Sequence, residues 1–374
     1  MNKKLFVVSG ALFFAACASN KDVIKIGTIG PLTGDGQSYG QDNLNAIRLR
    51  IDEINDAGGV NGKKIELVSE DAKCNGSDAT SAAQKLVNID KVAAILGGVC
   101  SSETLAAASV TEPAKMILLS AISTAPAVTD AGDYVFRASP SDANKGRELS
   151  KYFEREGYKK IGIITENTDF CQGLRTTVKN TMGSGASLAF DELVDQGTKD
   201  YRSLLTRLKD TDFDVIFING QTDATNVEMV KQARELGIKQ PFAGSDTSDS
   251  ATMGQLAPEA VEGMRVINTS NKLGEGGADS FAAKFRAKYG EPKANLSYAT
   301  LGYDSAGVLA EALKQVPTLD GAALRDALYN MNYAGAAGTI SFDKNGDVVG
   351  IGYALKEFRD GKIVEIEDIE ISLQ

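Results

Sequence analysis

The sequence contains neither histidine nor tryptophan among its 374 residues. Without histidine, neither a Ser-His-Asp nor a Cys-His catalytic group can be assembled. The commonest metal-ligating side chain is missing as well. We therefore expect a protein that is not an enzyme and that has no catalytic residue, no metal site and no cofactor.

Long apolar runs are also scarce. The run near the N-terminus, Leu5–Phe14, spans about ten residues, too few to cross a bilayer as a helix. Two lysines precede it and two alanines follow it, immediately before Cys17. This order is typical of a secretory signal, and it resembles one that ends in a lipidated cysteine. We expect residues 1–16 to be a lipoprotein signal peptide, Cys17 to carry the lipid and residues 17–22 to form a tether. An ordinary cleaved signal is the alternative.

Acidic residues outnumber basic ones by 50 to 40, which gives a formal net charge of −10. Such a balance disfavours binding to nucleic acids and to anionic lipids. It does not limit the charge inside a buried pocket. We expect an exported monomer, in the periplasm or cell envelope, that touches the membrane only through its N-terminal lipid and binds no nucleic acid.

There are four cysteines, and export would place them in an oxidising compartment. If Cys17 carries lipid, the other three leave one pair and one single thiol. Cys74 and Cys100 each follow a predicted strand, and consecutive parallel strands are usually neighbours, so both should lie at one edge of the sheet. We expect these two to form a disulfide, worth about 3–4 kcal/mol in the chain-entropy model, and Cys171 to be a buried free thiol.

Strand-like and helix-like segments alternate through two successive arrays, from residue 23 to 120 and from 147 to 246. Apolar residues at intervals of three and four predict a helix over 43–56, and we expect a strand over 187–194. Such alternation is typical of parallel sheets covered by helices, so we expect an α/β fold with two doubly wound lobes. Three helices, one of them over 296–315, and a hairpin-like segment over 339–366 then complete the chain.

Two serines occupy a turn that could bind an anion. In "GGVCSSETLAA", Ser101 and Ser102 stand where a predicted strand ends and a helix begins, and free backbone N–H groups and the helix dipole favour an anion there. A nucleophilic role for Cys100 would need a histidine base, which the sequence lacks. A serine nucleophile with a lysine base is conceivable, but no adjacent Ser-x-x-Lys spacing is present. The alternative is that one serine caps the helix. Ser123 and Thr124 end the next predicted strand and could join the same site.

Several motifs in order resemble one protein family. They are "GPLTG" and "GGVNG" near the start of the first array, the two cysteines Cys74 and Cys100, and "STAP" after the fourth strand. From Val23 to the C-terminus the chain resembles the branched-chain amino-acid-binding proteins of ABC importers, which are type I periplasmic binding proteins.

The resemblance implies two Rossmann-like lobes joined by a three-crossover hinge. It assigns residues 23–141 and 270–346 to the first lobe, and residues 142–269 and 347–374 to the second. The pairing of Cys74 with Cys100 is also that of the family.

The resemblance further implies a ligand pocket between the lobes. Ser101 and Ser102 would take the ligand carboxylate, and Ser123 and Thr124 would contact carboxylate and ammonium. Asp246 would bind the ammonium. The remaining expected ligand-binding residues are Tyr39, Phe170 and Gln221.

Gln221 stands where branched-chain binders commonly have tyrosine, so the ligand side chain could be larger or more polar than that of leucine. Asp246 is one methylene shorter than the usual glutamate, and a solvated loop acid is its alternative role.

We therefore expect an extracytoplasmic solute-binding lipoprotein that captures a small amino acid, branched-chain or other, and delivers it to the permease of an ABC importer. Two alternatives share the fold: a ligand sensor that feeds a signalling receptor, and a binder of a carboxylate or amide without an amine.

Overall fold

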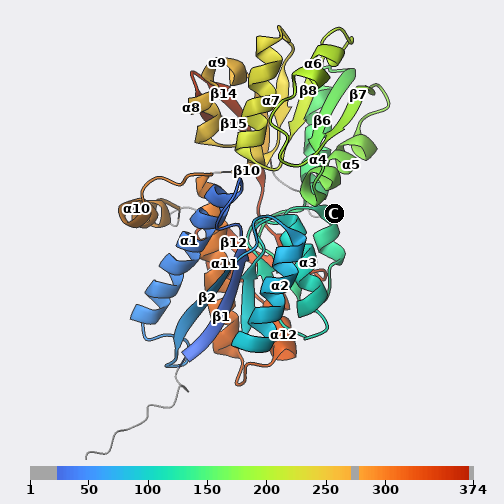
Figure 1. The fold of residues 1–374 in the computed structure, drawn as a ribbon. Helices are drawn as coiled ribbons and strands as arrows, with labels where there is room; N and C mark the ends of the chain where they lie inside the picture. The colour runs from blue at the N-terminus through green and yellow to red at the C-terminus, as the bar shows by residue number, and fades with distance from the viewer. Residues whose placement is uncertain (1–22, 271–277, 370–374) are drawn as a thin grey trace, which may run out of the picture.

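The computed structural model describes residues 23–270 and 278–369, which form two α/β lobes, one above the other in Figure 1. The first lobe is built on a five-stranded sheet in the order β2-β1-β3-β4-β5, and every neighbouring pair in it is parallel. Its strands are β1 (Val23–Gly30), β2 (Lys64–Asp71), β3 (Ala94–Gly97), β4 (Leu118–Ser120) and β5 (Val135–Arg137).

Helices cover both faces of this sheet. On one face, apolar residues of α1, α11 and α12 share a core with the strands, and on the other face those of α2 and α3 do so. A smaller apolar cluster holds α10 against α1 and α11. The helices are α1 (Gln37–Asp56), α2 (Gly76–Lys85), α3 (Ser101–Thr111), α10 (Ala278–Tyr289), α11 (Leu296–Gln315) and α12 (Gly321–Tyr329).

The second lobe has a seven-stranded sheet in the order β15-β14-β10-β9-β8-β6-β7. Five strands are parallel, but β14 pairs antiparallel with β10 and β15 pairs antiparallel with β14. The expected parallel sheet is thus extended in this lobe by two antiparallel strands from the C-terminal hairpin-like segment. The strands are β6 (Lys160–Glu166), β7 (Ser187–Val194), β8 (Val215–Asn219), β9 (Phe242–Gly244), β10 (Arg265–Thr269), β14 (Tyr353–Arg359) and β15 (Lys362–Ile369).

Six helices cover this second sheet. Apolar residues of α4 and α5 pack on one face, and those of α6, α7, α8 and α9 pack on the other. The helices are α4 (Asp142–Arg155), α5 (Asp169–Thr181), α6 (Arg202–Leu208), α7 (Asp223–Glu235), α8 (Ala251–Leu256) and α9 (Pro258–Val261).

The chain passes between the lobes three times. The first passage, residues 138–141, joins β5 to α4, and the second joins β10 to α10 through residues 271–277, which lie outside the described residues. The third precedes β14. Before it, β11 (Tyr333–Gly335), β12 (Gly338–Phe342) and β13 (Val348–Val349) form a small antiparallel sheet. Because β13 pairs with β12, we place the third passage at residues 350–352, later than the expected boundary at 346.

The expected signal peptide, the tether and Cys17 lie outside the described residues. Among the helices that are described, none combines the length and the apolar character needed to cross a membrane.

Candidate ligand-binding site

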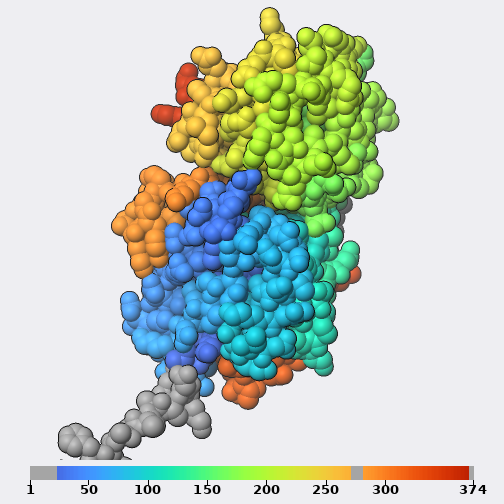
Figure 2. All heavy atoms as spheres, in the orientation of Figure 1, coloured from blue at the N-terminus to red at the C-terminus, as the bar shows by residue number. Residues whose placement is uncertain are grey.

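A pocket lies between the lobes, with an empty space of about 380 Å³ that includes its opening to solvent. Loops at the carboxyl ends of strands in both sheets line it, as expected for ligand sites in open α/β sheets. Figure 2 shows the two lobes in contact with each other around this level of the molecule. The lining residues are Gly36, Tyr39, Cys74, Val99, Cys100, Ser101, Ile122, Thr124, Phe170, Gln221, Thr222, Asp246, Thr247 and Tyr298.

Two glycines bring the serine turn close to the sheet. Gly97, the last residue of β3, has a φ of +154°, and a Cβ added to it would lie 2.3 Å from the carbonyl oxygen of Ile29. A Cβ on Gly98 would lie 2.4 Å from that of Glu103. A side chain at Gly97 would clash with the neighbouring strand β1, and one at Gly98 would clash with the first turn of α3, which explains the Gly-Gly pair before the turn.

Helix α3 begins at Ser101, with Cys100 in an extended conformation as its N-cap. The backbone N–H groups of Ser101 and Thr124, both of which line the pocket, have no hydrogen-bond partner within the described part of the chain. The hydroxyl of Ser101 accepts a hydrogen bond from the backbone N–H of Ala125 at 3.2 Å, so its own proton remains available to a ligand. Free N–H groups at a helix start and this hydroxyl suit a carboxylate.

Two of the expected carboxylate-binding hydroxyls do not reach the pocket. Ser102 donates its hydroxyl proton to the carbonyl oxygen of Cys74 at 3.2 Å. The buried hydroxyl of Ser123 donates a hydrogen bond to the carbonyl oxygen of Gly98 at 3.1 Å, and it lies 2.7 Å from the hydroxyl of Thr104. Both serines tie neighbouring loops together, so we no longer assign their side chains to the ligand.

The expected disulfide joins Cys74 to Cys100, with Cα atoms 5.2 Å apart. The expected adjacency of the two strands that precede the cysteines is wrong, because β1 lies between β2 and β3. The loops after β2 and β3 meet beyond the end of β1 instead, beside Gly36, where an added Cβ would lie 2.7 Å from the sulfur of Cys74.

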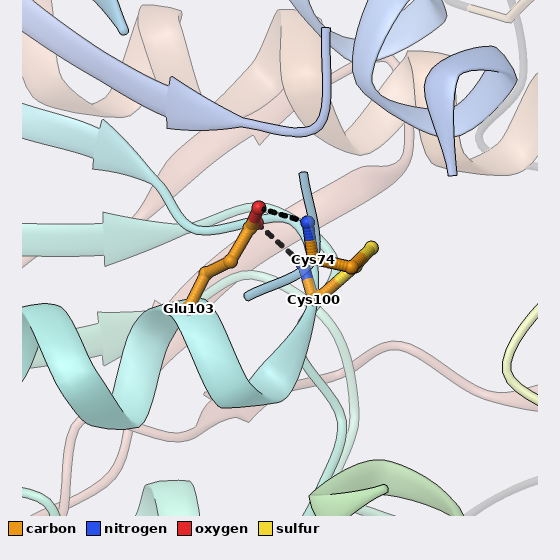
Figure 3. Close-up of side chains that lie close together, drawn as sticks. All are labelled: Cys74, Cys100 and Glu103. Atoms are coloured by element: carbon orange, nitrogen blue, oxygen red, sulfur yellow. Dashed lines mark hydrogen bonds between the residues drawn. A yellow bond between two sulfur atoms is a disulfide. The ribbon is translucent and has the colours of Figure 1, made fainter. Parts of the chain in front are cut away.

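A buried carboxylate supports this junction from within (Figure 3). Glu103, in the first turn of α3, accepts hydrogen bonds from the backbone N–H groups of Cys74 at 2.8 Å and of Val99 and Cys100 at 3.0 Å. Burial raises the pKa of Glu103 to about 7, although these three N–H groups lower it. Glu103 therefore fixes both loops at the carboxylate end of the pocket, and its charge depends on pH near neutrality.

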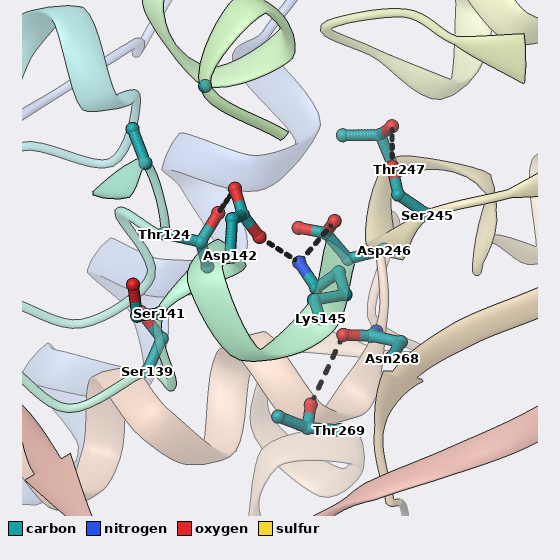
Figure 4. Close-up of polar contacts among 12 residues, drawn as sticks. Thr124, Ser139, Ser141, Asp142, Lys145, Ser245, Asp246, Thr247, Asn268 and Thr269 are labelled. Atoms are coloured by element: carbon teal, nitrogen blue, oxygen red, sulfur yellow. Dashed lines mark hydrogen bonds and ion pairs between the residues drawn. The ribbon is translucent and has the colours of Figure 1, made fainter. Parts of the chain in front are cut away.

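The opposite end of the pocket carries buried charge (Figure 4). Asp246 follows β9, and its Oδ1 lies 2.6 Å from the ammonium Nζ of Lys145 in α4. The same Nζ lies 2.7 Å from Oδ1 of Asp142, one turn earlier in α4. All three side chains are at most 4% exposed. Two carboxylates thus share one ammonium in the interior.

Burial raises the pKa of the Asp142 carboxyl, and the ammonium of Lys145 opposes that rise. Burial alone would lower the pKa of Lys145, but the carboxylates of Asp142 and Asp246 outweigh it and raise the pKa. Lys145 therefore stays charged.

Aromatic rings from both lobes flank the charged end. The phenol of Tyr298 in α11 donates a short hydrogen bond to Asp246, and burial together with that carboxylate raises the pKa of Tyr298 well above its ordinary value. The ring of Tyr39 in α1 lies 5.9 Å from that of Tyr298, measured between centroids. Phe170, at the start of α5, lies with its ring centroid 5.8 Å from the Nζ of Lys145.

Several of these contacts cross between the lobes. Thr124 of the first lobe donates its hydroxyl proton to Asp142 of the second at 2.8 Å, and Tyr39 donates to the carbonyl oxygen of Thr247 at 3.3 Å. The bond from Tyr298 to Asp246 also joins the lobes. Each end of the pocket therefore contacts the opposite lobe.

Gln221 follows β8, where its backbone N–H donates to the buried carboxylate of Glu166 at 2.7 Å, and it lines the pocket. Cys171 is a fully buried free thiol, and burial raises its pKa well above the ordinary value. A thiol held neutral in this way is a poor nucleophile.

The pocket thus brings together six of the eight expected ligand-binding residues. Those are Tyr39, Ser101, Thr124, Phe170, Gln221 and Asp246.

The sequence interpretation missed Asp142, Lys145 and Tyr298. Asp142 and Lys145 have the i, i+3 spacing of an ordinary helix ion pair, which gives no sign of burial. Asn295 caps α11 and indicates where that helix begins, but only the packing of α11 brings Tyr298 to the pocket.

Residues 23–362 match the sequence profile of the periplasmic binding protein family. A Pseudomonas aeruginosa protein described as a leucine-, isoleucine-, valine-, threonine-, and alanine-binding protein is 27% identical over 368 residues, which cover 97% of this chain and 98% of that protein.

Solved structures have the same fold. The branched-chain amino acid transporter substrate-binding protein of Streptococcus pneumoniae, in complex with isoleucine, matches with a TM-score of 0.84 and 29% identity, over 93% of this chain and 99% of that chain. A solute-binding protein of an R. palustris ABC transporter, in complex with benzoate, matches with a TM-score of 0.84 over 92% of this chain and 96% of that one. At 19% identity, that second match supports the fold alone.

The expected two-lobed fold is confirmed by these matches and by the two sheets. The chain belongs to the periplasmic binding protein family, and it is similar to the branched-chain amino-acid-binding proteins of ABC transporters.

Proposed function

We propose that this protein captures an α-amino acid between its lobes and delivers it to the permease of an ABC importer. It would act as an exported monomer in the periplasm or cell envelope, held to a membrane by a lipid on Cys17.

The pairing of two unlike ends in one pocket is the observation that carries this proposal. The free N–H groups of Ser101 and Thr124 and the hydroxyl of Ser101 suit a carboxylate. Asp246 reaches the pocket from the other lobe and suits an ammonium. An α-amino acid carries both groups, and burying either one unpaired would cost several kcal/mol.

The energies of these contacts are adequate for capture. Charge-assisted hydrogen bonds contribute about 1.5–3 kcal/mol each, so three or four of them reach the roughly 8 kcal/mol of micromolar binding, before ordering costs. Because the carboxylate end belongs to the first lobe and Asp246 to the second, the ligand has a higher affinity for the closed form.

Isothermal titration with a panel of α-amino acids tests the proposal directly. The control ligands are the same molecules without the amine, and benzoate. We expect at least one amino acid to bind and D246N to weaken that binding by about tenfold or more, because the ammonium loses an ionised partner. Binding of the amine-free carboxylates alone would overturn the amino-acid assignment and favour the alternative carboxylate binder.

A further inference from the structure

The charge at the ammonium end does not come from Asp246 alone. Asp142 and Asp246 each contact the Nζ of Lys145, at 2.7 and 2.6 Å, so two carboxylates surround one ammonium. The other contacts to these carboxylates are also donors: the hydroxyl of Thr124 at Asp142 and the phenol of Tyr298 at Asp246. A site made of donors suits ionised carboxylates, which accept hydrogen bonds only.

Other buried cations do not complete the balance. Arg137 is paired with Asp347 at 2.6 Å, and Lys356 is paired with Asp249 at 2.6 Å. Of the buried cations that the structure describes, Lys145 is the one that contacts Asp142 and Asp246. With both carboxylates ionised and Lys145 protonated, the cluster of Asp142, Lys145 and Asp246 carries a net charge of minus one in a place from which water is largely excluded.

An uncompensated buried charge is costly, and a ligand that neutralises it removes that cost. We propose that Asp142 and Lys145 together set the charge of the ammonium subsite, so that the pocket selects ligands with one ammonium group over the same molecules without it. This inference rests on the proposed amino-acid binding and adds two specificity residues to it. Asp142 acts through the cluster and is a positioning residue.

The contacts explain why a lysine is present beside an ammonium site. With Lys145 alone facing Asp246, the pair would be neutral and an ammonium would gain little from entering. With Asp142 and Asp246 but no lysine, two buried carboxylates would repel each other strongly. The observed set of three leaves a single charge for the ligand to balance.

The test compares two ligands on each variant. They are the amino acid that binds most tightly in the panel and the same molecule without its amine; for L-leucine, the second is 4-methylpentanoate. The measured quantity is the ratio of their affinities by isothermal titration. General damage to the pocket lowers the affinity for both ligands and leaves their ratio unchanged. Loss of one charge lowers the affinity only for the ligand that carries the ammonium.

D142N makes the cluster neutral, and we expect the ratio to fall by about tenfold or more. D142A removes the same charge with a smaller side chain and serves if D142N does not fold, as judged by circular dichroism. D142N/K145M removes one charge of each sign and restores a net charge of minus one, so its ratio should return to within about threefold of the wild-type value.

The outcomes separate the two proposals. If the wild-type affinity ratio favours the amino acid and is unchanged in D142N and D142A, the proposed role of Asp142 is overturned. The proposed function is kept in that case. A ratio that stays low in D142N/K145M shows that side-chain shape rather than charge is responsible, and it also overturns the inference. A wild-type protein that binds no amino acid overturns the proposed function as well.

Discussion

The two ends of the pocket are built by different means. The carboxylate end uses backbone N–H groups and one hydroxyl, held by the disulfide and by Glu103 within a single lobe. The ammonium end uses side-chain charges, and contacts from the opposite lobe complete it. Perturbing the first end should therefore change the stability of its lobe, and perturbing the second should change which ligand binds.

Removing the disulfide should have the largest effect. C74S/C100S opens a loop that spans 26 residues of sequence separation, and the free energy of unfolding should fall by about 3–4 kcal/mol. Urea unfolding with and without reductant measures this change, and reductant should have no further effect on the double variant. A loss below about 1 kcal/mol would mean that the packing around the loops, and not the cross-link, sets the stability of this end.

Glu103 should make stability depend on pH. Its pKa is about 7 in the folded protein, against an ordinary value of 4.5, so between these values the folded state holds a proton that the unfolded chain has released. The stabilisation is full below pH 4.5 and is lost as the pH rises through 7. At 1.36 kcal/mol per pKa unit, wild type should lose about 3 kcal/mol relative to E103Q across this interval.

Urea unfolding of wild type and E103Q at several pH values between 4 and 8 provides the measurement. Other titrating groups are common to both proteins and cancel in the difference. Parallel stability curves would show that Glu103 has the same pKa in the folded and unfolded states, and would contradict the raised pKa.

S101A should separate ligand contact from loop support. It removes the hydroxyl proton available to the ligand carboxylate, so affinity should fall by about tenfold. It also leaves the N–H of Ala125 without its acceptor, at a cost of about 1 kcal/mol or more. S102A is the matched control: its hydroxyl contacts Cys74 and not the pocket, so affinity should stay within about twofold. Equal losses in the two variants would contradict the assignment.

The smallest effect should come from the exposed ion pair between the lobes. Lys199 of the second lobe lies 2.9 Å from Asp35 of the first, with both side chains more than half exposed. Exposed pairs contribute at most about 1 kcal/mol and are screened by salt. D35N should change affinity by less than about threefold and only at low ionic strength. A larger effect that persists in high salt would make this pair part of the closing mechanism.

The sequence predicted the elements of strong periodicity and the end of the pocket built from local structure. The helix over 296–315 and the strand over 187–194 have the bounds expected for them, and the helix after the Gly-Gly pair begins at Ser101, within the expected strand-to-helix turn. Capping, glycine positions and apolar spacing are local properties, which explains this success. Helix α1 begins at Gln37, earlier than its apolar spacing suggested.

The missing parts depend on long-range packing. No local feature shows that β14 pairs antiparallel with β10, which lies more than eighty positions earlier in the chain. The ion pair of Asp142 and Lys145 has ordinary surface spacing, and burial alone gives it importance. The sequence places Ser102 and Ser123 at the correct edge of the sheet, but their hydroxyls hydrogen-bond to neighbouring loops and neither residue lines the pocket.

The three passages between the lobes have a consequence for the order in which the protein is synthesised. The first lobe includes α11, α12 and β13, and the second includes β14 and β15, so neither lobe is complete until nearly the whole chain has been translated. Domains made of continuous sequence can fold one after another on the ribosome. Here a nascent chain of 300 residues holds all five strands of the first sheet but lacks most of α11 and all of α12, which cover one face of it. The same chain lacks β14 and β15 of the second sheet. We therefore expect both lobes to reach their final packing only at the end of synthesis.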